Sequence, residues 1–104
     1  MTFVLALLNP NTNPAHTEAM AAVALAALPG GCRVEGCTAE RGPESIESDV
    51  DAAVSAAEVL EMMRRTPAAD AYLIACFGDP GLHGARELTS APVVGIGEER
   101  NLLP

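Results

Sequence analysis

The fold is decided by the stretch Ala71-Tyr72-Leu73-Ile74-Ala75-Cys76-Phe77-Gly78-Asp79-Pro80-Gly81. Its first five residues form an apolar run, which is typical of a strand buried in a sheet. Gly78, Pro80 and Gly81 then favour a sharp turn. Asp79 is expected to cap a following helix with Pro80 at its first position, and residues 82–88 continue that helix. The stretch therefore predicts a strand, a tight turn and a short helix.

Cys76 falls at the junction between this strand and this helix. A thiol there lies near the unpaired N–H groups and the positive dipole end of the helix, which favours the thiolate over the thiol. The other interpretation is packing, because free cysteine is among the most often buried residue types. Asp79 also has two interpretations, either the helix cap, which we prefer, or a general base near Cys76. The stretch alone leaves these roles open.

The rest of the chain repeats the alternation of strand and helix. We expect strands over residues 3–8, 32–38, 71–75 and 92–96, and helices over 15–28, 49–65 and 80–88. The long second helix carries an apolar stripe composed of Val50, Ala53, Val54, Ala57, Leu60 and Met63. The order β-α-β-α-β-α-β predicts a single α/β lobe over residues 1–104, doubly wound around a mostly parallel four-stranded sheet. Ligands bind such sheets at the carboxyl ends of the strands.

Length and composition indicate one globular domain with an acidic surface. The 104 residues are 49% hydrophobic and carry a formal net charge of −8, which argues against binding to nucleic acid or to an anionic membrane. The first eight residues lack the positive charge of a secretion signal, and their apolar run is too short to span a bilayer. Three cysteines are an odd number, which argues against a disulfide framework. We therefore expect a cytoplasmic protein.

Two loops are expected at the ligand edge of the sheet. The loop after the first strand presents Asn9, Asn11 and Thr12 next to a helix start, where they suit an amide or carboxylate ligand. The same residue types are ordinary in turns and caps, so the loop also has a purely structural interpretation. The second loop, residues 42–46, is either a flap over the ligand or a linker. No glycine-rich phosphate motif can be found, which leaves a nucleotide cofactor unsupported.

Four other side chains with reactive groups are expected to have structural roles. His16 and His83 have no acidic partner at metal-ligand spacing, so we expect two exposed helix residues and no metal site. Cys32 and Cys37 lie in the second strand without activating neighbours and are expected to pack.

Four ordered motifs together resemble one family. They are Asn9-Pro10-Asn11-Thr12, Gly42-Pro43-Glu44-Ser45-Ile46-Glu47, Ala75-Cys76-Phe77-Gly78-Asp79-Pro80-Gly81 and Pro92-Val93-Val94-Gly95-Ile96-Gly97-Glu98. In this order and at this spacing they resemble the hydantoin racemase branch of the aspartate/glutamate racemase superfamily, which includes allantoin racemase. The resemblance runs from residue 3 to residue 98.

The resemblance implies an enzyme that uses neither pyridoxal phosphate nor a metal, so no cofactor is expected. In the family, two cysteines face each other across a small substrate such as a hydantoin, allantoin or an amino-acid derivative. One cysteine removes the proton α to a carbonyl, and the other delivers a proton to the opposite face. Cys76 matches the first cysteine, and Asn11 and Thr12 match the loop that contacts the substrate. The backbone N–H groups of Phe77 and Gly78 are expected to stabilise the carbonyl or the thiolate.

The chain also departs from the family pattern. Family members have two similar α/β lobes, with the second cysteine in the second lobe, whereas residues 1–104 match the amino-terminal lobe. Cys32 and Cys37 cannot replace the second cysteine because they lie within a strand. The sequence therefore predicts one lobe with the second lobe absent, as in a truncated or frame-shifted product. An apolar surface is then expected where the second lobe belongs.

Three functional interpretations follow. The first is a racemase-family lobe in which Cys76 removes a proton α to a carbonyl and which is incomplete without a second lobe. The second is a non-catalytic lobe that binds a small molecule or a protein and has kept only the fold. The third is a pair of chains, either a homo-oligomer in which the two Cys76 residues face each other or a complex with a partner that supplies the second lobe.

Overall fold

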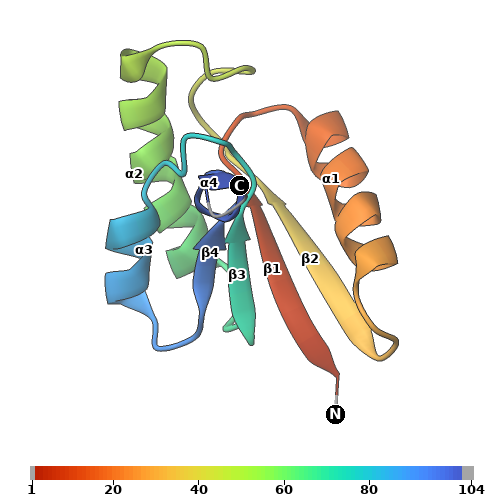
Figure 1. Ribbon diagram of the computed structural model, residues 1–104. Coiled ribbons are helices and arrows are strands. Elements are labelled where there is room, and N and C mark those ends of the chain that lie inside the picture. Colours follow the sequence, from red (N-terminus) through yellow and green to blue (C-terminus); the bar gives the residue numbers. More distant parts are fainter. Residues whose placement is uncertain (1, 102–104) are drawn as a thin grey trace.

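The computed structural model describes residues 2–101, which form a four-stranded parallel sheet flanked by helices (Figure 1). The elements, in chain order, are β1 (Phe3–Asn9), α1 (Pro14–Ala27), β2 (Cys32–Thr38), α2 (Asp49–Arg65), β3 (Ala71–Ile74), α3 (Leu82–Leu88), β4 (Val93–Gly95) and α4 (Ile96–Asn101). The strand order is β2-β1-β3-β4, and each neighbouring pair is parallel. The predicted α/β lobe is confirmed, while α4 is an element that the sequence pattern does not predict.

The sheet topology determines where a ligand site belongs. β1 pairs with β2 on one side and with β3 on the other, so the winding direction changes between β1 and β3. Accordingly, α1 lies on one face of the sheet, and α2 and α3 lie on the other (Figure 1). Leu8 pairs with Ile74 at the end of the ladder between β1 and β3, so the loops that leave these strands start at the same level. Doubly wound sheets bind ligands at such a switch point.

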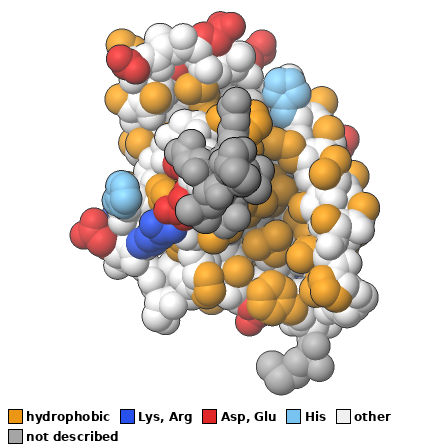
Figure 2. Space-filling view, viewed as in Figure 1, with side chains coloured by type: hydrophobic (Ala, Val, Ile, Leu, Met, Phe, Trp, Pro, Cys, Tyr) orange, Lys and Arg blue, Asp and Glu red, His pale blue; other side chains and the backbone are white. Residues whose placement is uncertain are grey.

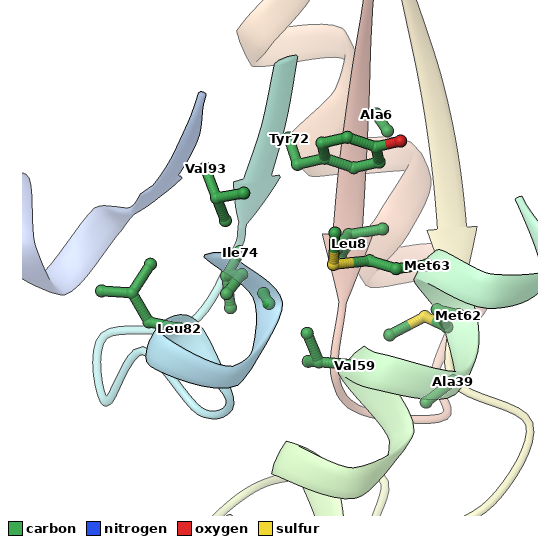
Figure 3. Packing of buried hydrophobic residues seen from close by; sticks show 11 residues of the cluster. Ala6, Leu8, Ala39, Val59, Met62, Met63, Tyr72, Ile74, Leu82 and Val93 are labelled. Atoms are coloured by element: carbon green, nitrogen blue, oxygen red, sulfur yellow. The ribbon is translucent and has the colours of Figure 1, made fainter. Parts of the chain in front are cut away.

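The hydrophobic core fills the space between the sheet and the helices α2 and α3. Val59, Met62 and Met63 of α2 pack toward the sheet, where Leu8 and Tyr72 face them (Figure 3). Alternate strand residues point to this face because the side-chain period of a strand is two. The full cluster consists of Ala6, Leu8, Ala39, Val59, Met62, Met63, Tyr72, Ile74, Leu82, Ala85 and Val93.

The core-facing side of α2 shares Met63 and the partly buried Leu60 with the predicted stripe, but not the other members of that stripe. The predicted stripe includes Val50 and Val54, but these residues are 73% and 43% exposed. The apolar pattern misplaces the face because two of the buried positions, Ser55 and Glu58, are polar. Glu58 tolerates burial because its carboxylate accepts a hydrogen bond from the backbone N–H of Arg41 at 3.3 Å. The buried residues of α2 are Ser55, Glu58, Val59, Met62 and Met63.

The helix α3 begins later than predicted. Its first residue is Leu82, and its N-cap position is Gly81, which has φ 77° and provides no side-chain cap. Asp79 does not cap α3, since its backbone is left-handed at φ 49° and its carboxylate accepts a hydrogen bond from the N–H of Gly97 at 2.8 Å. Pro80 consequently lies in the turn before the helix. Both the predicted capping role of Asp79 and the helical position of Pro80 are wrong.

The face of the sheet that carries α1 is less completely covered. A groove of about 350 Å³ lies between α1 and the sheet, and apolar residues line it: Leu7, Ala19, Met20, Val23, Ala24, Leu73, Ala75 and Ile96. We call it the α1 groove. Hydrophobic side chains gather over this face of the molecule (Figure 2). Despite this apolar surface, no helix within residues 2–101 is long and apolar enough to cross a membrane.

Candidate active site

Three loops lie at the carboxyl edge of the sheet. They comprise residues 10–13 after β1, 39–48 after β2 and 75–81 after β3. Backbone hydrogen bonds hold the first two loops together: the N–H of Thr12 donates to the carbonyl of Pro43 at 3.0 Å, and the N–H of Ala39 lies 3.1 and 3.2 Å from the carbonyl oxygens of Asn9 and Asn11. The loop after β2 is therefore docked against the loop that is expected to contact the substrate.

Asn9 is the centre of a hydrogen-bond network beneath these loops. Its side chain is fully buried, and its Oδ1 accepts from the backbone N–H of Asn11 at 3.1 Å. Its Nδ2 lies 3.0 Å from Asn11 Oδ1, 3.1 Å from the carbonyl of Asn13 and 2.9 Å from Thr17 Oγ1. Thr17 Oγ1 in turn lies 2.7 Å from Thr38 Oγ1 in β2. Because an unpaired buried polar group costs about 1–3 kcal/mol, this network fixes the loop after β1 to both α1 and β2.

Asn11 has at least one side-chain donor left for a ligand. Its Oδ1 accepts from Asn9 and from the N–H of Asn13 at 2.9 Å, and one Nδ2 hydrogen faces Nδ1 of His16 at 3.2 Å. The other Nδ2 hydrogen has no partner in the described part of the chain, and it suits a carbonyl oxygen. His16 is exposed, as predicted, and its Nε2 also approaches Asn13 Nδ2 at 3.3 Å. A neutral imidazole accepts at one nitrogen, so it bonds to one of these amides at a time.

Cys76 lies on the other side of the switch point, two residues beyond the end of β3. The residue is half-buried and outside the core cluster, and its thiol is free. Its carbonyl accepts from the N–H of Asp79 at 3.0 Å, which closes a tight turn. Phe77 and Gly78 at the tip of this turn are exposed. The helix α3 starts only at Leu82. The predicted proximity of the Cys76 thiol to the N-terminus of this helix therefore stays a prediction.

A buried carboxylate anchors the loop after β2. Glu58 of α2 is 6% exposed, and its Oε2 lies 3.7 Å from Nε of Arg41, in addition to the bond that Oε1 accepts from the Arg41 backbone. Such partners are needed because an unpaired charge inside a protein costs several kcal/mol. Nearly one helical turn earlier, Ser55 Oγ is buried and has no hydrogen-bond partner among residues 2–101.

An ion pair links α3 to α4 near the turn that carries Cys76. Arg86 Nη2 donates to Glu98 Oε1 at 2.7 Å, and Arg86 Nε donates to the carbonyl of Val93 at 3.1 Å. The hydrogen bond from Arg86 lowers the pKa of Glu98 below its ordinary value. The same bond, together with a smaller effect of the Asp79 charge, raises the pKa of Arg86. The pair therefore stays charged at neutral pH and ties α4 to the rest of the lobe.

Neither of the other two cysteines lies in the loops at the carboxyl edge of the sheet, since both belong to β2. Cys32 pairs with Phe3 at the amino end of the sheet. Cys37 packs against the core cluster, as predicted, with its Sγ 3.5 Å from Thr66 Oγ1. Among the side chains that the structure describes, no group of three or more His, Cys, Asp or Glu could hold a metal ion.

Sequence reasoning missed the residues that support the site. Thr17 is buried although it lies in the first turns of a helix, and its position four residues after the cap residue Asn13 is the available signal. Thr38 and Glu58 could not be identified in this way, because their partners lie 21 and 17 residues away in the chain.

Comparison with known proteins identifies the family. A family model described as Asp/Glu/Hydantoin racemase matches residues 5–100. The chain belongs to this racemase family. Hydantoin racemases from Paenarthrobacter aurescens and Pseudomonas sp. strain NS671 are 40% and 42% identical to it over 95 and 94 residues, which is 88% of this chain in each case.

Solved structures of racemases share the fold. Allantoin racemase from Klebsiella pneumoniae superposes with a TM-score of 0.89 and 41% identity over 93% of this chain. Allantoin racemase from Pseudomonas fluorescens gives 0.87 and 30% over 90%. The chain spans 40% of the length of each of these two proteins and 40% and 38% of the two hydantoin racemases. The resemblance read from the four sequence motifs is confirmed.

Proposed function

We propose that this chain supplies one face of a racemase site, with Cys76 as the base that removes the proton α to a carbonyl. The proposed substrate is a hydantoin, allantoin or a related amino-acid derivative, as the names of the four related racemases suggest. The observation that carries the proposal is the position of Cys76 beside the switch point of the sheet, across from the loop of Asn11 and Thr12. Ligand sites of doubly wound sheets lie at this position.

In the proposed step, the thiolate of Cys76 forms an S–H bond with the α hydrogen. The electron pair of the broken C–H bond moves into the adjacent carbonyl group, so that negative charge develops on its oxygen. The remaining Nδ2 hydrogen of Asn11, the hydroxyl of Thr12 and the backbone N–H groups of Phe77 and Gly78 are the proposed donors to this oxygen. Each well-placed donor of this kind contributes about 3 kcal/mol in other enzymes. The proposed chemistry uses no cofactor.

The acid that completes a two-base racemisation is proposed to come from outside these 104 residues. Cys32 lies at the amino end of β2 and Cys37 packs against the core, so neither is proposed as this acid. A second copy of the chain or a partner polypeptide is the proposed source of this acid. Because the proposed base is a free thiol, we propose the reducing cytoplasm as its location.

Hydrogen exchange at the substrate α carbon tests the proposal. The exchange of a 5-substituted hydantoin and of allantoin is followed by NMR in D2O with the unaltered protein, with Cys76→Ser and with Cys32→Ser as the matched control. We expect exchange above the uncatalysed rate with the unaltered protein and with Cys32→Ser. Cys76→Ser should fall to the uncatalysed rate, because a hydroxyl is a much weaker base than a thiolate. Equal exchange with all three proteins would contradict the proposal, and no catalysed exchange would favour a non-catalytic binding lobe.

A further inference from the structure

The turn that carries Cys76 rests directly on the junction between β4 and α4. Asp79 Oδ1 accepts a hydrogen bond from the N–H of Gly97 at 2.8 Å. A Cβ atom on Gly95 would overlap the Asp79 carboxylate, and one on Gly97 would overlap the carbonyl oxygen of Phe77. Glycine at both positions lets the two backbone segments approach this closely. The sequence motifs over residues 75–81 and 92–98 thus form one structural unit.

Each hydrogen-bonding group of Asp79 joins a different part of this unit. Its N–H donates to the carbonyl of Cys76 at 3.0 Å, and its carbonyl accepts from the N–H of Leu82 at the start of α3 at 3.1 Å. Its carboxylate reaches Gly97 in the first turn of α4. The backbone of Asp79 has φ 49°, a conformation that costs most residues about 1–2 kcal/mol but that aspartate and asparagine tolerate. One residue therefore holds Cys76, α3 and α4 in a fixed arrangement.

We propose that Asp79 is a positioning residue for Cys76, and that its hydrogen bond to Gly97 holds the turn that presents the thiol. This role differs from both sequence-based interpretations of Asp79, the cap of α3 and the general base. It requires a hydrogen-bond acceptor at Oδ1 and does not require a negative charge. The inference rests on the proposed function for its catalytic consequence, whereas its structural consequence, the reactivity of Cys76, is measurable without any substrate.

The reactivity of the Cys76 thiol tests this role directly. Alkylation by iodoacetamide is quantified by mass spectrometry on the peptide that contains Cys76, with the Cys32 and Cys37 peptides of the same sample as references for global unfolding. We expect Asp79→Asn, which keeps the acceptor, to stay within about twofold of the unaltered protein. Asp79→Ala should raise the rate about fivefold, because a half-buried thiol on an unsupported turn becomes more accessible.

The control variant Glu98→Gln weakens the tie of α4 to Arg86 and leaves Asp79 intact, so its Cys76 peptide should react like that of the unaltered protein. In D2O exchange, Asp79→Asn should keep most of the activity, while Asp79→Ala should lose more than about tenfold. Unchanged alkylation in Asp79→Ala, or equal changes in Asp79→Ala and Asp79→Asn, would overturn the inference. An unaltered protein without exchange would contradict the proposed function, and the alkylation rates would still decide the role of Asp79.

Discussion

At the scale of single residues, the polar side chains around the site differ in how well they are paired. Thr17 Oγ1 accepts a hydrogen bond from Asn9 Nδ2 and forms a second one with Thr38 Oγ1, in the network that fixes the loop after β1. Ser55 is also buried, but its hydroxyl has no partner in the part of the chain that the structure describes. A buried hydroxyl group contributes to the stability of the fold only when it forms a hydrogen bond. The two residues should therefore respond oppositely to the loss of their hydroxyl groups.

Ser55→Ala is expected to raise the free energy of unfolding by about 1 kcal/mol, because it removes a buried group that gains nothing in the folded state. Thr17→Val is the matched contrast, since it removes a paired hydroxyl with little change in shape. It should lower the free energy of unfolding by about 1–3 kcal/mol. Urea unfolding followed by circular dichroism measures both values. A destabilised Ser55→Ala would show that its hydroxyl is paired in solution.

At the scale of secondary-structure elements, local signals could predict most of the fold. Apolar runs indicated β1 and β3, and an alternating pattern indicated β2. Asn13 followed by Pro14 indicated the start of α1, where Asn13 Oδ1 accepts from the N–H of Ala15 at 3.0 Å. The buried face of α2 and the start of α3 could not be predicted in this way. Glu58 is buried through a partner 17 residues away, and Asp79 bonds to Gly97 18 residues away. Local patterns contain no information about such partners.

The candidate site, like the fold, could be predicted from local signals but not where it depends on contacts between distant residues. The sequence places Asn11, Thr12 and Cys76 at one edge of the sheet, because strand ends in a parallel sheet share an edge. The network beneath Asn11 depends on the pairing of β1 with β2, which brings Thr38 next to Thr17. Only a three-dimensional arrangement reveals such a network.

The tie between α3 and α4 should depend on pH. The hydrogen bond from Arg86 lowers the pKa of Glu98 in the folded protein. The pair therefore contributes its stability above the ordinary glutamate value of about 4.5, and this contribution is lost as the pH falls through the lower folded pKa. Glu98→Gln should lower the melting temperature slightly at about pH 7 and by less at about pH 3. An effect of the same size at both pH values, by thermal denaturation, would contradict the assignment.

At the scale of the whole molecule, the α1 groove is an open hollow lined by apolar residues. We expect a second lobe or a second copy to pack there. Val23 in this groove is 72% exposed, and Val50 on α2 is 73% exposed. Val50 is therefore a matched control for a substitution of Val23. Exposed apolar patches of several hundred Å² commonly mark interaction sites.

The unaltered chain is therefore expected to self-associate as its concentration rises. Val23→Glu should weaken this association by about tenfold or more, because it places a charge in the apolar contact, whereas Val50→Glu should leave it unchanged. Sedimentation velocity over a range of concentrations measures the association. A chain that stays monomeric throughout, or two variants with equal effects, would exclude the α1 groove as the contact.

If Cys76 serves one face of the substrate, the two enantiomers of a 5-substituted hydantoin must behave differently, so each is followed separately in D2O. Deuterium incorporation is measured by NMR and configuration by chiral chromatography, with the uncatalysed rate subtracted and at concentrations where the chain is monomeric. We expect one enantiomer to exchange with retention of configuration and this exchange to disappear in Cys76→Ser. Exchange of both enantiomers with inversion, or exchange that survives Cys76→Ser, would contradict the claim.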